Sequence, residues 1–137
     1  MDAVIQSFLS GLPILLLHFV LTLLMLGAGA VIYHMVTPYH EVDLIKEGNL
    51  AAAVSFGGVL VGMAIPLAVN MAGGVNAFDI LIFGALAIAL QLLAYRITDL
   101  VLKDLPARIT AGEVSAAITL VAIKLSISVI NAAAVSG

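Results

Sequence analysis

The chain has 137 residues, of which 64% are apolar and 9% are charged, and its net charge is -3. A soluble domain is about half apolar and about a quarter charged, so this composition excludes a water-soluble globule and indicates one membrane domain over residues 1–137. No basic run is present for nucleic acid to recognise. The chain also has no cysteine, which excludes disulfides and thiolate chemistry.

Four apolar segments predict membrane-spanning helices, because about 20 apolar residues in a helix cross the hydrocarbon. In chain order they cover residues 8–36, 50–72, 78–98 and 114–135. The first is long enough to tilt or to project beyond the bilayer. It lacks a basic start and is too long for a signal peptide, so we expect a retained span. The links between the segments are residues 37–49, 73–77 and 99–113.

The basic residues predict the orientation of the spans. Lys46 lies in the first link, and Lys103 and Arg108 lie in the third, whereas the second link and both termini have no Lys or Arg. The positive-inside rule therefore places the first and third links in the cytoplasm and both termini outside it.

The two halves of the chain contain a repeated pattern. The letters I-x-x-G-N-x-x-A-A at residues 45–53 reappear as I-x-x-G-E-x-x-A-A at residues 109–117. Asn49 suits a helix cap, and Glu113 suits the first turn of a helix. We therefore expect an all-α membrane fold of two tandem helical hairpins, related by a pseudo-two-fold axis along the membrane normal. The two copies cover about residues 8–72 and 78–135.

The first link carries a second, family-level pattern. Residues 37–52 read T-P-x-H-E-x-x-L-I-x-x-G-N-x-x-A, and F-G-G at residues 56–58, Gly62 and I-P-L at residues 65–67 follow. This stretch resembles the DUF350 family, also called UPF0719, and the similarity extends over most of the chain. The resemblance implies a four-span bacterial inner-membrane protein. It also implies a setting in envelope stress, since some members are encoded near phage-shock-type proteins. It implies no catalytic residue or ligand.

Lys124 is the one charged residue in the middle of an apolar run, and no Asp or Glu lies in the apolar stretches to neutralise it. A lysine at the bilayer centre costs about 2.5–3.5 kcal/mol on translocon scales. It either extends along its stem to an interface or serves as a buried amine that binds an anion, passes a proton or lines a polar path. His18 and Gln91 fall at a similar depth, so we predict a polar layer of His18, Gln91 and Lys124. The alternative is a shared depth without contact.

The fourth span is polar on two nearly opposite faces. One stripe contains Ser115, Thr119 and Ser126, and the other contains Lys124, Ser128 and Asn131. A helix with two polar faces suits surroundings of protein or water, which predicts a homo-oligomer with this span near the subunit interface. The alternative is that the hydroxyls bond back to carbonyls of their own helix.

The second span contains residues suited to close packing. Gly58 and Gly62 form a G-x-x-x-G pair that allows two helices to approach closely, within the chain rather than between subunits. Pro66 should kink this helix and free the carbonyl of Gly62.

The polar residues of the cytoplasmic links are candidates for partner binding. They are His40, Glu41, Lys46, Asn49, Arg108 and Glu113. His40 and Glu41, with nearby acids, offer oxygen and imidazole donors to a divalent cation, but a solvated loop is the favoured interpretation. We predict no metal site and no cofactor.

No hydrolase elbow, phosphate loop or nucleotide fingerprint occurs, so we do not expect an enzyme. The favoured prediction is a structural or adaptor component of the envelope stress response, set in lipid, with a cytoplasmic protein partner. The alternative is a small homo-oligomeric channel or transporter-like protein with a polar path along the fourth span around Lys124. Replacing Lys124 should abolish flux only in the channel. Changing Glu41, Lys46 or Arg108 should abolish partner binding only in the adaptor.

Overall fold

The computed structural model describes residues 1–136, which form helices, turns and short connections without a strand. The helices are α1 (Asp2–Val36), α2 (Glu41–Lys46), α3 (Leu50–Gly73), α4 (Ala77–Val101), α5 (Asp104–Thr110) and α6 (Val114–Ser136). Four of them, α1, α3, α4 and α6, have the length and hydropathy to cross a membrane. The predicted all-α class and the four spans are therefore confirmed. Two of the predicted segments were too short, because α1 begins at Asp2 and α4 continues to Val101.

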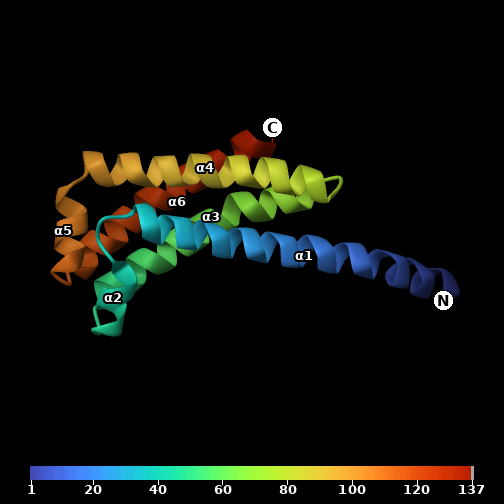
Figure 1. Ribbon diagram of the computed structural model, residues 1–137, viewed down its shortest axis with the longest axis horizontal. Coiled ribbons are helices and arrows are strands. Elements are labelled where there is room, and N and C mark those ends of the chain that lie inside the picture. The colour runs from blue at the N-terminus through green and yellow to red at the C-terminus, as the bar shows by residue number, and fades with distance from the viewer. Residues whose placement is uncertain (137) are drawn as a thin grey trace.

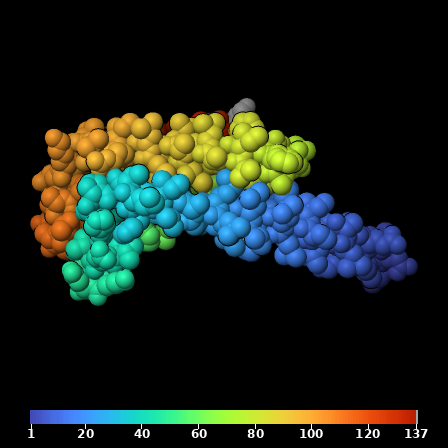
Figure 2. Space-filling model, viewed as in Figure 1, coloured from blue at the N-terminus to red at the C-terminus, as the bar shows by residue number. Residues whose placement is uncertain are grey.

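The centre of the bundle is the pair α3 and α6, which have the most extensive contacts of any two helices. α4 packs against both helices of this pair, α1 packs against α3 and α4, and the N-terminal end of α1 extends past the others (Figure 1). The space-filling view shows this end of α1 standing apart from the bundle (Figure 2). α1 buries only Met25, Gly29 and Tyr33. At about 1.5 Å per residue, its 35 residues exceed the hydrocarbon thickness of about 30 Å.

Small side chains bring α3 and α6 close together. Ala51 and Ala52 of α3 share one buried cluster with Ala116 and Ala117 of α6. Further along α3, a Cβ atom added at Gly58 would collide with the side chain of Val121. The G-x-x-x-G pair of α3 therefore faces its own chain.

The two predicted cytoplasmic links each contain a short helix and end in the same turn. Gly48 and Gly112 have φ angles of +85° and +91°, in the left-handed region that favours glycine. The amide of Gly48 donates to the carbonyl of Ile45, and that of Gly112 to Ile109, both at 2.9 Å. The repeated sequence pattern thus produces a repeated turn.

Asn49 connects the two links. Its side-chain oxygen accepts from the amide of Ala52 at 3.0 Å and caps α3. Its side-chain nitrogen donates to the carbonyls of Ile109 and Thr110, both at 3.2 Å. One residue therefore satisfies an orphan amide at a helix start and two carbonyls at the end of α5.

Candidate functional site

Lys124 lies near the middle of α6, and its side chain is completely buried. Its Nζ atom is 3.1 Å from Oδ1 of Asp99 on α4, whose side chain is only 5% exposed. The rings of Tyr95 and Tyr33 flank the ammonium, with centroids 5.1 and 5.7 Å from Nζ. A carboxylate and two ring faces therefore stabilise the cation inside one chain. The expectation that no acid neutralises Lys124 was wrong.

Asp99 reaches Lys124 because α4 is longer than its apolar run. The sequence interpretation ended the span at Thr98 and put Asp99 in the link, but the helix continues to Val101. Asp99 follows Tyr95 by four residues, so both side chains lie on the same face of the helix. That spacing is the signal in the sequence that could have indicated the pair.

Glu41, the first residue of α2, is also buried, at 2% exposure. The hydroxyl of Tyr33 on α1 donates to its Oε1 atom. Burial raises the pKa of the Glu41 carboxyl, although the nearby hydroxyls of Ser55 and Tyr33 and the charge of Lys124 act in the opposite direction. Glu41 therefore lies in the interior, and not on an exposed surface as its prediction as a partner-binding residue required.

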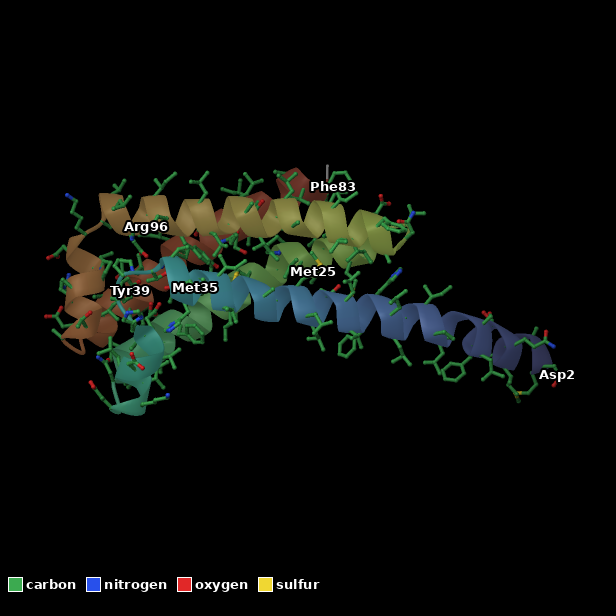
Figure 3. All side chains as sticks on the ribbon, in the orientation of Figure 1. Asp2, Met25, Met35, Tyr39, Phe83 and Arg96 are labelled. Carbon is green, nitrogen blue, oxygen red and sulfur yellow. The ribbon has the colours of Figure 1, made fainter. Side chains whose placement is uncertain are left out.

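We call Tyr33, Glu41, Tyr95, Asp99 and Lys124 the charge cluster. Tyr39 lies at its edge, with its hydroxyl 3.5 Å from Oδ2 of Asp99. Burial, followed by the charges of Glu41 and Asp99, raises the pKa of the Tyr39 hydroxyl. Figure 3 shows Tyr39 at the end of the bundle where α2 and α5 lie, far from Asp2 at the opposite end of α1.

The charge cluster is incompletely paired. It contains two carboxyl groups and one ammonium. Oε2 of Glu41 and the hydroxyl of the neighbouring Ser55 are buried without a hydrogen-bond partner. Lys124 and Asp99 meet at an ion-pair distance, but without the alignment of a hydrogen bond. Buried polar atoms without partners are rare in folded proteins, so this group is the strongest candidate for a functional site.

The rest of the inward stripe of α6 bonds to α3 and α4. Asn131 donates to Oε1 of Gln91 at 2.9 Å and to the carbonyl of Ala87 at 3.1 Å. The hydroxyl of Ser128 donates to the carbonyl of Gly62. That carbonyl is free because Pro66, four residues later, has no amide hydrogen.

His18 lies apart from the other two residues of the predicted polar layer. It is half-buried on α1. At 1.5 Å per residue it is about 22 Å along the helix from Tyr33, which contacts Lys124. Gln91 bonds to Asn131 instead. The depth that the sequence suggested for His18 is therefore not shared with Lys124, and the three side chains do not form one layer.

Hydroxyl groups on the outward stripe of α6 bond to carbonyls of their own helix, which was the alternative interpretation of this stripe. Thr119 donates to the carbonyl of Ser115 at 2.9 Å, and Ser126 donates to that of Ala122 at 2.8 Å. Ser115, Thr119 and Ser126 are exposed, and the hydroxyls of Thr119 and Ser126 need no partner from another subunit. These two hydroxyls therefore give no support for a homo-oligomer.

Exposed charges gather on the links. Lys46, Glu47 and Lys103 are exposed, and Arg108 pairs with Glu113 and, at 3.7 Å, with Asp104. His40 is exposed as well. Within residues 1–136, no group of three or more His, Asp or Glu could hold a metal ion.

Comparison with known proteins places the whole bundle in one family. The model of the family described as Domain of Unknown Function (DUF350) matches residues 7–135, which include parts of all four long helices. The UPF0719 inner membrane protein YjfL of Escherichia coli (strain K12) is 32% identical over 102 residues, 74% of this chain and 77% of that protein. Its namesake from Escherichia coli O157:H7 matches to the same extent. No solved structure matches the chain.

Proposed function

The chain belongs to the DUF350 family, and we propose that this multi-pass inner-membrane protein is a structural adaptor that binds a cytoplasmic protein. The observation that carries the proposal is the separation of its charges. Lys124 is enclosed and paired with Asp99 inside one chain, where it holds α4 to α6. The charges open to a partner are on the links instead. The family resemblance implies the envelope stress response as the setting.

We call the exposed charges of α2 and α5 and their turns the link surface. It consists of Asp43, Lys46, Glu47, Lys103, Asp104, Arg108 and Glu113. Both signs are interspersed, which favours a partner with mixed charges over an anionic polymer. We place this surface in the cytoplasm and both termini outside it. The positive-inside rule supports this orientation, as do the termini, which lie away from α2 and α5 (Figure 1).

We also propose the pseudo-two-fold relation between residues 8–72 and 78–135 within one domain. The matched turns at Gly48 and Gly112 support it. The central pairing of α3 with α6, the last helix of each copy, supports it too.

Site-specific photocrosslinking in cells tests the adaptor. A photoreactive residue at Lys46 should give a discrete adduct with another protein. The same probe at Val129, an exposed apolar residue of α6, should not. Reversing the charge by Arg108→Glu should weaken the adduct, because it changes the link surface and leaves the bundle intact. Adducts of Lys46 with lipid or with copies of this chain alone would contradict the proposal.

A second function, a path for protons or anions, has one specific observation in its favour. Buried polar atoms without hydrogen-bond partners occur on and beside the inward stripe of α6, on Glu41, Lys124, Gln91 and Asn131. Water joining them would make a polar route through the bundle. Flux across liposomes with wild-type protein that disappears in Lys124→Leu would establish this function. Absence of flux with both proteins folded would exclude the proton or anion path and leave the adaptor as the proposed function. Homo-oligomer formation also stays a prediction, supported by the apolar length of α1 outside the bundle.

A further inference from the structure

We propose that the charge cluster is a proton-binding site, in which Glu41 holds a proton while α2 is docked and releases α2 when the proton is lost. The proposal concerns the state of the chain alone. It does not depend on whether the link surface binds a partner.

The balance of charges is the first reason. The groups that face Glu41 come from each element around it: Tyr33 from α1, Ser55 from α3, Asp99 from α4 and Lys124 from α6. Tyr39, in the connection before α2, also lies close. Together with Glu41, these groups include two carboxyl groups and one ammonium. A buried carboxylate without a counter-charge is strongly unfavourable, so one of the two acids takes up a proton.

The contacts identify Glu41 as the acid that holds the proton. Asp99 has the ammonium of Lys124 at 3.1 Å, whereas Glu41 accepts one hydrogen bond, from Tyr33, on Oε1. A proton on Oε2 of Glu41 gives this unpartnered atom a hydrogen to donate. The hydroxyl of Ser55, which also lacks a partner, can accept it. The raised pKa of Glu41, which burial causes, agrees with this assignment.

The position of Glu41 connects the proton to the movement of α2. α2 has only six residues, and the left-handed Gly48 follows it closely. A raised pKa in the docked state means that docking is strongest below the ordinary pKa of 4.5. Docking is then lost as the pH rises through the raised value. Lys46 and Glu47 move with α2, so pH would set the arrangement of the link surface.

Spin labels can measure this movement directly, because the natural chain has no cysteine. Labels at Lys46→Cys on α2 and Lys103→Cys beside α5 are both at exposed positions. In lipid nanodiscs without a partner, pulsed EPR should give one narrow distance at low pH and a broad distribution at high pH. The infrared band of a protonated carboxylic acid should disappear over the same pH range.

Three variants make the experiment decisive. Glu41→Gln copies the protonated form, so it should keep the narrow distance at every pH and lose the titrating infrared band. Asp43→Asn, a change at an exposed acid of the same helix, should behave as the wild type. Tyr33→Phe removes a hydrogen-bond donor to the carboxylate and should move the midpoint to higher pH.

Two results would overturn the proposal. One is a wild-type protein whose distance and infrared band do not change with pH. The other is a Glu41→Gln protein that keeps the pH response of the wild type. Both are read without a partner, so neither depends on the outcome of the photocrosslinking experiment.

Discussion

The link that ends at Asn49 and the link that ends at Glu113 share a turn but differ in what they bring to the interior. Each has a glycine in the left-handed conformation, whose amide donates a hydrogen bond of 2.9 Å to a backbone carbonyl. The first link inserts Glu41 into the bundle. Its counterpart 64 residues later is Leu105, which packs against an apolar cluster. The backbone of the turn is repeated, whereas the chemistry it carries is not.

The spans differ in the same way. Sixty-four residues before Lys124 the chain has Leu60, and the residue that corresponds to Asp99 is Met35. Gly62 packs against Tyr95, whereas its counterpart Ser126 is exposed. The ion pair therefore occurs once, with groups from both halves around it. The difference teaches that a repeat can supply the framework while the candidate site forms where the repeat is broken.

Removing the unrepeated cation should have the largest effect. Lys124→Met leaves the buried carboxylate of Asp99 without its counter-charge and should destabilise the fold by about 3–5 kcal/mol. The matched change Leu60→Met, at the corresponding place in the first half, should cost less than about 1.5 kcal/mol. Unfolding in mild detergent by circular dichroism measures both. Equal effects would mean that the break in the repeat has no importance for stability.

The glycines of α3 offer an intermediate effect. A Cβ atom at Gly62 would collide with the hydroxyl of Tyr95, which donates to the carbonyl of Val59 at 2.9 Å. We expect Gly62→Ala to cost about 1–3 kcal/mol. Gly57→Ala meets open space and should be neutral or stabilise α3 by up to about 1 kcal/mol. If thermal unfolding shows the same change in stability for both variants, Gly62 and Tyr95 do not approach as closely as described.

The two turns themselves should respond unequally, with the smallest effect. Asn49→Ala removes the cap of α3 and two bonds to the end of α5, and should cost about 1–2 kcal/mol. Glu113→Ala removes only an exposed pair with Arg108, so its unfolding should match that of the wild type. A larger loss from Glu113→Ala would reverse the roles that we give to the two turns.

Composition and periodicity predicted the framework, because lipid leaves a long apolar segment few alternatives to a helix. The repeated pattern around Asn49 and Glu113 marks a turn that occurs in both links, a feature that depends on local sequence alone. The site was harder to predict. Counting residues fixes neither how far a helix extends past its neighbours nor which neighbour a side chain faces, so His18 was grouped with Lys124. Charge alone also placed Asp99 in a link and Glu41 on the surface, since only tertiary packing shows that they are buried.

A double-mutant cycle between Lys124 and Asp99 tests the central claim most directly. Lys124→Met, Asp99→Asn and the double variant are unfolded under the same conditions as the wild type. If the two side chains form the buried pair, the double variant should be more stable than the sum of the single losses by about 2 kcal/mol. Additive losses, with no coupling between the sites, would contradict the pair and the charge cluster built around it.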